Sequence, residues 1–541
     1  MRRFKDTFDG LINYNLAIMK NQFLRALFTA FAFAASHAGA AAFDTIIRNG
    51  RVVDGTGSPA FFADVGISEG RIVAVGHITN SAKHELDAHG LIVAPGFIDL
   101  HTHADEVADQ PLAENFLRMG VTTVVVGNCG SSTLNVKKFF REIEDKHVSL
   151  NVATLVGHNS VREEAMGGSF DRKPTEKELA RMRELVDRAM DDGAQGLSTG
   201  LIYLPGTFSQ TDEIVELARV AAKHGGRYAT HMRHEDARIF DALKEAMRIG
   251  REAGLPVHVS HLKLSGERSW GQADKVLAFL EETRRSGLDV SWDQYAYTAS
   301  STSLAQLIPD TARDGGNKKF IERLRDETQK AKIVADMKGK MRDRGATNYA
   351  YAVIASYKHD PKLNGKNIVE AAKIMRGADT MDDQIETILE IQKNGGGSGV
   401  FHGMSEPDLQ TFMRHPFTAV ACDSAIREFG KEVPHPRGYG NNARVLGRYV
   451  RDLGVLRLED AVRKMSSLPA NDFHFEGRGL VRPGNWADIV VFDPATVRDN
   501  ATYDDPHHYA TGFAFVLVNG EVVVEQDKHT GAKPGMALRH Q

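Results

Sequence analysis

The chain has 541 residues, of which 42% are hydrophobic and 26% charged, proportions typical of a packed globular protein and not of a disordered one. At roughly 150 residues per domain, this length predicts two or three domains. The net charge of −4, without local clusters of Lys and Arg, gives no electrostatic basis for binding nucleic acid or an anionic membrane surface.

Residues 1–42 are predicted to be an N-terminal extension, and from residue 19 onward they have the layout of a secretory signal. Basic residues come first, an apolar core runs from about Leu27 to Ala35, and small residues follow. The apolar core is shorter than the ~20 residues of a membrane-spanning helix, so we expect no integral span in the mature protein. This layout predicts a periplasmic or secreted protein; the alternative is a cytoplasmic protein with a disordered leader.

Short apolar runs alternate with turn signals at both ends of the chain. Residues 43–95 are predicted to form hairpins, with turns at Asn49-Gly50 and Glu69-Gly70. Near the other end, LVNGEVV repeats the pattern of IRNGRVV. We therefore predict that residues 43–95 and 477–541 together form one small β-sandwich domain, which brings the two chain ends together.

The long middle segment, residues 96–476, alternates apolar strands with amphipathic helices such as EKELARMRELVDRAMDDG and ADKVLAFLEETRRSG. Eight such strands with helices between them predict the α/β class and a (β/α)8 TIM-like barrel. The segment of about residues 302–400 is too long for an ordinary strand-to-helix connection. We interpret them as an insertion that serves as a lid or specificity element. The strand candidates are GFIDLHTH, VTTVVVGNCG, VSLNVATLVGHN, GAQGLSTGL, RYATHMRHE, VHVSHLK, LDVSWDQYAY and FTAVACDSA.

The stretch VAPGFIDLHTHAD, residues 93–105, is predicted to be a buried strand that ends in His101 and His103. Alternate strand residues share a face, so both imidazoles can reach one metal ion. On its own, this pair is equally consistent with a polar rim.

Further residues of metal-ligand type follow four other strands: Cys129 the second, His231 the fifth, His261 the sixth and Asp423 the eighth. The carboxyl ends of barrel strands meet at one mouth, so all six residues are predicted to form a metal site. The chain has two cysteines, which favours a chemical role for Cys129 over a disulfide framework. Cys422 points away from Asp423 and is interpreted as a packing residue.

The sequence resembles the amidohydrolase superfamily and, within it, the D-aminoacylase (N-acyl-D-amino-acid deacylase) family. The resemblance covers nearly all of residues 44–535 and is carried by PGFIDLHTHAD, VVVGNCG, GLSTGLIYLPG, THMRHE, SHLK, ACDS and HPRGYG. It implies a tight zinc site and a weaker second position. The tight site would comprise Cys129, His231 and His261, and the second position His101, His103 and Asp423.

The residue types agree with one tight and one weaker metal position. Many binuclear barrel hydrolases bridge their metals with a modified lysine on the fourth strand, but GAQGLSTGL contains none, so a cysteine must supply the bridging anion. A thiolate with two imidazoles suits Zn²⁺ and leaves a fourth position for water. Cys129 and Asp423 alone would neutralise two ions poorly. We therefore expect one tightly bound zinc and at most a weak second one.

The site implies an amide hydrolase that acts on a small-molecule N-acyl-D-amino acid. Zinc would polarise the amide carbonyl and activate water, and Asp423 would pass the proton of that water to the departing amine. The resemblance implies four substrate-binding residues, of which Arg437 suits a carboxylate best because a guanidinium can form two parallel hydrogen bonds. These four are Arg437, Lys263, Tyr203 and Tyr295.

Three other functions remain open from the sequence. A cyclic-amide hydrolase of the hydantoinase or dihydroorotase kind shares the barrel and the HxH strand but typically carries the bridging lysine. A deacylase restricted to D-peptides or to acidic N-acyl-D-amino acids would share the whole site. A non-catalytic binding protein of the same fold would be expected to have lost ligands, yet all six are present. The sequence leaves the oligomeric state unknown.

Overall fold

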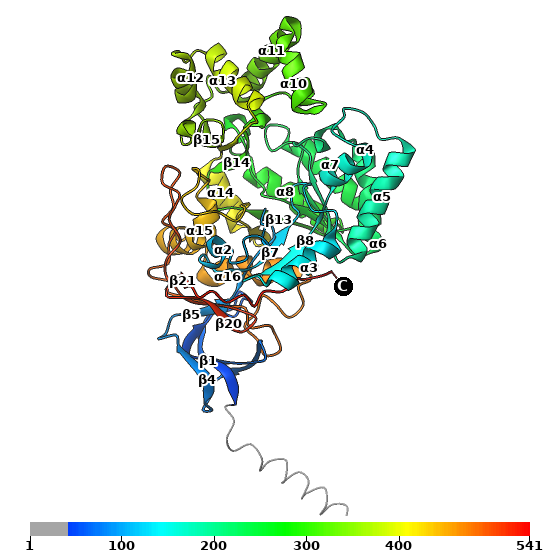
Figure 1. Cartoon of the computed structure of the whole chain (residues 1–541). Helices are drawn as coiled ribbons and strands as arrows, with labels where there is room; N and C mark the ends of the chain where they lie inside the picture. Colours follow the sequence, from blue (N-terminus) through cyan, green and yellow to red (C-terminus); the bar gives the residue numbers. More distant parts are fainter. Residues whose placement is uncertain (1–41, 541) are drawn as a thin grey trace, which may run out of the picture.

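A computed structural model describes residues 42–540 (Figure 1), so the predicted signal segment lies almost entirely outside the described residues. In Figure 1 the strands of a β-domain lie at the bottom, a barrel occupies the centre, and a helical insertion lies at the top. Within residues 42–540, no helix combines the length and the apolar character that crossing a membrane requires.

The centre of the molecule is a barrel of parallel strands. Strands β6, β7 and β8 pair in one sheet, and β9 to β13 with β17 pair in another. Only Leu155 separates β8 from β9, and a parallel bridge between Thr102 and Ser424 joins the ends of β6 and β17, which closes the barrel. With β8 and β9 counted as one barrel strand, the barrel has eight strands, and the predicted (β/α)8 barrel is confirmed. Its strands are β6 (Phe97–Asp99), β7 (Val121–Val126), β8 (Asn151–Thr154), β9 (Val156–Gly157), β10 (Gly196–Gly200), β11 (Arg227–His231), β12 (Val257–Val259), β13 (Val290–Gln294) and β17 (Thr418–Val420).

Amphipathic helices cover the outside of the barrel, and the two helices read from the sequence are present. Helix α5 begins with a capping box at Thr175 and buries Met182, Leu185 and Val186 on one face, as a three-and-four spacing of apolar residues predicts. The helices around the barrel are α2 (Glu114–Leu117), α3 (Val136–Lys146), α4 (His158–Met166), α5 (Glu176–Asp191), α6 (Thr211–Lys223), α7 (Ile239–Ala253), α8 (Ala273–Arg285), α14 (Glu406–Arg414), α15 (Arg437–Arg444), α16 (Leu458–Met465) and α17 (Ser467–Asp472).

Strands from both chain ends form one nine-stranded sheet in the order β21-β20-β19-β18-β5-β1-β2-β3, with β4 paired to β1. Strand β5 connects the two ends, because it pairs with β1 on one side and with β18 on the other. Residues of both ends also share one apolar core, so the predicted small β-domain is present. Its strands are β1 (Phe43–Val52), β2 (Phe61–Ser68), β3 (Arg71–Gly76), β4 (Ala82–Asp87), β5 (Ile92–Pro95), β18 (Ile489–Phe492), β19 (Phe513–Val518), β20 (Glu521–Glu525) and β21 (Lys528–His529).

One of the two predicted hairpin turns is wrong. Glu69-Gly70 does connect β2 to β3, but Asn49-Gly50 lies inside β1, where the register with β2 shifts. Asn49 has a φ of 55°, which Asn tolerates better than most residues. The Asn-Gly pair therefore forms an irregularity within a strand, and the chain reverses only after β1 ends at Val52.

The predicted single strand before His101 is in fact two strands in different sheets. Strand β5 ends at Pro95 in the terminal sheet, and β6 begins at Phe97 in the barrel. A Cβ atom on Gly96 would lie 2.3 Å from the hydroxyl oxygen of Thr122. Gly96 therefore permits the close approach through which the chain passes from one sheet into the other.

The insertion is a compact unit between β13 and β17 with its own apolar core. Its three strands form an antiparallel sheet in the order β14-β16-β15, and α10 to α13 lie above it, away from the β-domain (Figure 1). Its elements are β14 (Ala299–Ser303), α9 (Asp310–Arg313), α10 (Gly316–Arg325), α11 (Glu327–Arg344), β15 (Ala352–Ser356), α12 (Ile368–Arg376), α13 (Met381–Lys393) and β16 (Ser398–His402).

Candidate metal centre

Three of the six predicted metal ligands have an unusual backbone conformation. The φ angles are 53° for Cys129, 37° for His261 and 50° for Asp423. Positive φ is uncommon outside glycine, and such strain concentrates at functional sites where the surrounding structure maintains it. At the end of its strand, each of these residues turns the chain, so the barrel itself fixes where their side chains lie.

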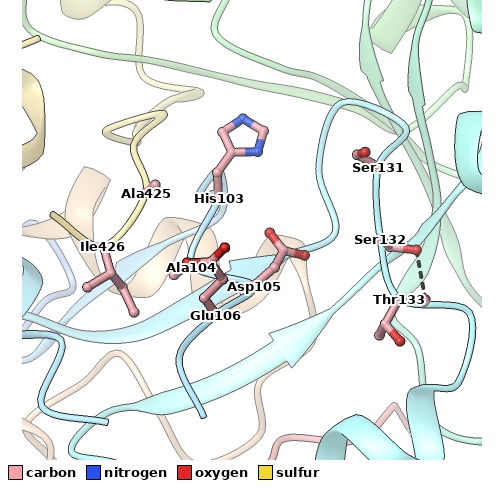
Figure 2. A pocket seen from close by; sticks show the side chains of 9 residues that line it. All are labelled: His103, Ala104, Asp105, Glu106, Ser131, Ser132, Thr133, Ala425 and Ile426. Atoms are coloured by element: carbon pink, nitrogen blue, oxygen red, sulfur yellow. Dashed lines mark hydrogen bonds between the residues drawn. The ribbon is translucent and has the colours of Figure 1, made fainter. Parts of the chain in front are cut away.

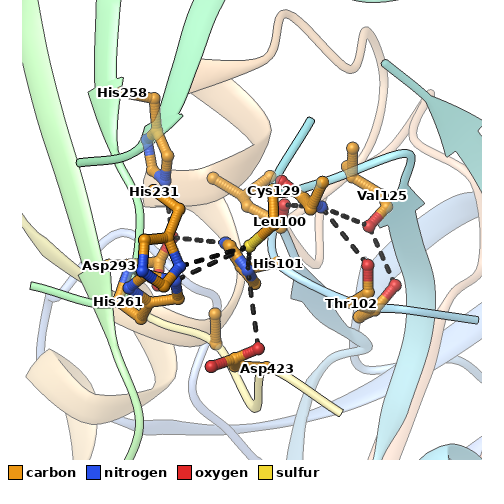
Figure 3. Close-up of polar contacts among 12 residues, drawn as sticks. Leu100, His101, Thr102, Val125, Cys129, His231, His258, His261, Asp293 and Asp423 are labelled. Carbon is orange, nitrogen blue, oxygen red and sulfur yellow. Dashed lines mark hydrogen bonds and ion pairs between the residues drawn. The ribbon is translucent and has the colours of Figure 1, made fainter. Parts of the chain in front are cut away.

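Cys129 lies at the centre of the cluster (Figure 3). Its Sγ is 3.6 Å from Nδ1 of His231, 3.7 Å from Nε2 of His261 and 3.3 Å from Nε2 of His101. The potential ligand atoms of Cys129, His231 and His261 all lie within 4.8 Å of one another. The structure therefore brings together the three residues predicted to form the tight site.

The protonation of these groups fits a soft divalent cation. Burial lowers the pKa of His231 and of His101 well below the usual value, so both imidazoles are neutral and can offer a lone pair. Burial raises the pKa of the Cys129 thiol well above its usual value, so a thiolate there requires a neighbouring cation. A thiolate with imidazole ligands matches the set that zinc prefers.

Glu235, which was not predicted from the sequence, supports His261 and lies near His231. Its Oε1 lies 3.0 Å from Nδ1 of His261, and its Oε2 lies 3.8 Å from Nε2 of His231. A carboxylate that accepts a hydrogen bond from the Nδ1–H of His261 leaves Nε2 free to face Cys129. Burial raises the pKa of Glu235, but Lys263 and the two histidines outweigh burial and hold it well below its usual range. In the sequence, its position four residues after His231, in THMRHE, is the feature that could have identified it.

Lys263 also lies beside His261. Its Nζ is 2.5 Å from Oε1 of Glu235 and 2.7 Å from Nδ1 of His261, and the residue is 3% exposed. The ammonium group therefore contacts Glu235 and His261, which belong to the metal cluster. Its assignment to substrate stays a prediction.

The other side of the cluster is charged. Oδ1 of Asp423 lies 3.3 Å from Nε2 of His103 and 3.6 Å from Nε2 of His101, while Oδ2 lies 3.0 Å from Nη1 of Arg437. Burial raises the pKa of Asp423, but Arg437 and the histidines outweigh it and hold the pKa well below the usual value. The three residues predicted to complete a second metal position therefore meet, and Arg437 competes with a second ion for their one carboxylate.

Two tyrosines of the predicted substrate set border the cluster. The guanidinium carbon of Arg437 lies 4.5 Å from the ring centre of Tyr295, a distance typical of a cation–π contact. The ring of Tyr203 packs edge-on against His231 at 4.9 Å, and its hydroxyl accepts a 3.0 Å hydrogen bond from Thr302 of β14. Tyr203 therefore connects the metal cluster to the insertion.

Two pockets open on either side of His103 and Ala425, which line both of them. The larger has a volume of about 420 Å³ and is bordered by Asp105, Glu106 and the hydroxyl residues 131–133 (Figure 2).

The smaller pocket, of about 240 Å³, reaches from Asp423 to the insertion. We call it the arginine pocket because Arg427 and Arg437 both line it. Of the four predicted substrate residues, Arg437 is the one that lines either pocket.

A buried charged layer lies beneath the cluster and was not predicted. Asp293, near the end of β13, accepts a 2.8 Å hydrogen bond from the backbone N–H of His261. Its other oxygen lies 2.7 Å from Nε2 of His258 (Figure 3). Burial lowers the pKa of His258, but Asp293 and Asp472 outweigh burial and raise it to about 9. Cys422 lies outside the cluster, fully buried, with its N–H donated to Asp99, as a packing residue would.

Comparisons with known proteins show the family to which the chain belongs. The Amidohydrolase family model matches residues 84–524. A D-aminoacylase of Alcaligenes xylosoxydans xylosoxydans is 35% identical over 92% of this chain and 97% of its own length.

Two solved structures cover 92% of the chain at 34% identity. One is a D-aminoacylase, studied for one-metal activation and second-metal attenuation of its binuclear metal centre, with a TM-score of 0.79 over 100% of its length. The other is an N-acyl-D-glutamate deacylase from Bordetella bronchiseptica complexed with zinc and a phosphonate inhibitor, with a TM-score of 0.78 over 99% of its length. With the family model matched over most of its length, this chain belongs to the Amidohydrolase family.

Proposed function

We propose that this protein is a zinc-dependent amide hydrolase that removes the acyl group from N-acyl-D-amino acids, releasing a carboxylate and a free D-amino acid. The observation that carries the proposal is the convergence of Cys129, His231 and His261 beside the Asp423–Arg437 ion pair. The likeness to a D-aminoacylase over nearly the whole chain supports the same activity.

Cys129, His231 and His261 would hold one zinc ion, because they supply a potential thiolate and two neutral or supported imidazoles at one point. When bound, zinc polarises an amide carbonyl and lowers the pKa of water from ~15.7 toward ~7. His101, His103 and Asp423 offer a second, weaker position. Its weakness follows from Arg437, which already neutralises Asp423.

Asp423 is proposed to move the proton. Arg437 holds Oδ2, so Oδ1 remains to face His103 and the reaction centre. An ionised carboxylate in this position can accept a proton from water and deliver it to the departing amine. The low pKa of Asp423 keeps it ionised at neutral pH.

Arg437 is proposed to bind the carboxylate of the amino acid, because it lines the pocket beside Asp423. Tyr295 supports Arg437 through its ring, and Tyr203 borders the same space through Thr302. Lys263 completes the proposed substrate set as the sequence implied, although its observed contacts are with Glu235 and His261.

The remaining alternatives fit less well. Strand β10, the fourth of the barrel, reads GLSTG and lacks the lysine that cyclic-amide hydrolases typically carry. A protein that only binds its ligand would not need to maintain three strained ligand residues. Restriction to D-peptides or to acidic N-acyl-D-amino acids stays open within the same site.

A substrate panel tests the proposal. Purified protein with added zinc should hydrolyse N-acetyl-D-amino acids, and the N-acetyl-L-amino acids should be poor substrates. A preference for L substrates, or activity on hydantoin or dihydroorotate without activity on the panel, would refute it.

We also propose that the protein is exported to the periplasm or secreted, on the basis of the signal layout that begins at residue 19. N-terminal sequencing of the protein from its native host should find a start just after Ala38 or Ala40. An intact Met1 or Met19 on the mature protein would contradict export.

A further inference from the structure

The arginine pocket contains a second guanidinium that the proposed reaction does not use. Arg427 lines it together with Arg437 and Asp423. The pocket therefore presents two cationic side chains, together with the carboxylates of Asp423 and Glu432, next to the place where the substrate carboxylate is proposed to bind.

Arg427 is held in place from several directions. Its backbone N–H donates to Oδ1 of Asn115, and its Nε donates to the hydroxyl of Ser424, each at 3.3 Å. Asn115 also donates to the carbonyl oxygen of Gly438, which ties this loop to the residue after Arg437. A Cβ on Gly438 would lie 3.2 Å from Cγ of Arg427, so the stem of Arg427 packs where Gly438 has no side chain.

Arg427 forms no ion pair within residues 42–540, although the charge of Glu432, which also lines the pocket, acts on it. Asp423 pairs with Arg437, whereas Glu432 is exposed and accepts a 2.5 Å hydrogen bond from Ser356. The two terminal nitrogens of Arg427 have neither an ion pair nor a hydrogen bond to the described part of the chain. A guanidinium in this state can bind a carboxylate through two parallel hydrogen bonds.

The rest of the pocket wall is polar. Four hydroxyl residues of the insertion face it, and its apolar members are small. A long aliphatic side chain would find little apolar surface to bury against there. Burial and the charge of Arg437 lower the pKa of Arg427, whereas Glu432 raises it, and an anion bound beside the two guanidinium groups would relieve their repulsion. The hydroxyl residues are Ser301, Thr302, Ser303 and Ser398, and the apolar ones are Ala355, Ala425 and Pro434.

We propose that Arg427 binds a second carboxylate on the substrate, so that the enzyme prefers N-acyl-D-amino acids with an acidic side chain. Arg437 takes the carboxylate of the α-carbon and Arg427 that of the side chain. This inference rests on the proposed deacylase function and specifies its substrate class.

The test compares N-acetyl-D-glutamate with N-acetyl-D-glutamine, which has the same shape without the charge. Wild-type enzyme should show the higher kcat/KM with the glutamate substrate. Arg427→Met should lower the glutamate-to-glutamine ratio by roughly 10-fold or more, because a charged partner of the side chain is lost. Arg427→Lys keeps the charge and should retain part of the preference.

Lys431→Met is the matched control. Lys431 is an exposed cation on the same loop, so its loss changes the local charge without changing the pocket. Its ratio should equal that of wild type. If the glutamate-to-glutamine ratio fell equally in Lys431→Met and Arg427→Met, the effect would come from the general electrostatic field. That result would overturn the proposed contact between Arg427 and the substrate.

Two further results would overturn the proposal: a wild-type enzyme that hydrolyses N-acetyl-D-glutamine or N-acetyl-D-methionine at least as well as the glutamate substrate, or an unchanged ratio in Arg427→Met. Circular dichroism checks that the variants fold. If Arg427→Met does not fold, the wild-type ratio and Arg427→Lys decide. Failure to hydrolyse any N-acetyl-D-amino acid with zinc present would instead refute the deacylase function itself.

Discussion

The two sides of the metal centre are built from opposite kinds of group. On the side of Cys129 and His261 the ligands are buried, and His261 has a side chain only 1% exposed. On the side of His103 and Asp423 the contacts are ionic, and the His103 side chain is 34% exposed. The closed side is suited to hold an ion permanently, and the open side, which borders both pockets, is suited to exchange water and substrate.

The largest effect on the difference between the two sides is expected when the thiol of the closed side is removed. Cys129→Ala should lose its tight zinc and its activity, because two imidazoles alone hold zinc weakly. Elemental analysis and the N-acetyl-D-amino acid assay measure both. Cys422→Ala is the control and should keep zinc and activity, since Cys422 only packs beside Asp99. Equal zinc in wild type and Cys129→Ala would show that the closed side does not depend on the thiol.

The open side is tested next by Asp423→Asn. Asparagine keeps the shape but cannot accept a proton at neutral pH, so kcat should fall by roughly 10²–10⁴-fold. Zinc on the closed side should remain near one ion per chain. A kcat within a few-fold of wild type would mean that another base moves the proton.

Arg437→Met separates the two functions proposed for the open side. The kcat/KM for N-acetyl-D-amino acids should fall by roughly 30-fold or more, since a partner of a buried carboxylate is lost, and the D over L ratio should shrink. Arg437 lowers the pKa of Asp423, so its removal raises that pKa. Activity requires ionised Asp423 and should therefore begin to fall at a higher pH than in wild type as the medium is acidified. An unchanged acidic limb of the pH–rate profile would contradict the pairing seen here.

The smallest effect on activity is expected from the support of the closed side. Glu235→Gln should weaken zinc binding by roughly 10–100-fold, as loss of a carboxylate behind a metal-binding histidine commonly does. With saturating zinc, most of the activity should return. Chelator competition measures the affinity. Full affinity in Glu235→Gln would mean that the carboxylate does not orient His261.

Much of this comparison could be predicted from the sequence, and the part that could not has a physical reason. Cys129, His231 and Asp423 were recognisable because each ends a short apolar run, and a barrel brings such ends together. The pairing of Arg437 with Asp423, and of Glu235 with Lys263, depends on side-chain directions across different strands, which spacing along one strand does not encode. Asn49-Gly50 was misread because the same pair suits both a tight turn and a bulge.

The sheet shared by both chain ends sets an order of events during synthesis. Strand β5 is synthesised early, yet its partner β18 begins only at Ile489. One edge of β5 therefore stays unpaired until the barrel and the insertion have been synthesised. An open strand edge invites pairing with other chains. Ribosome-bound chains halted before residue 489 should therefore be cut by protease within residues 43–95, and chains halted beyond β20 should resist.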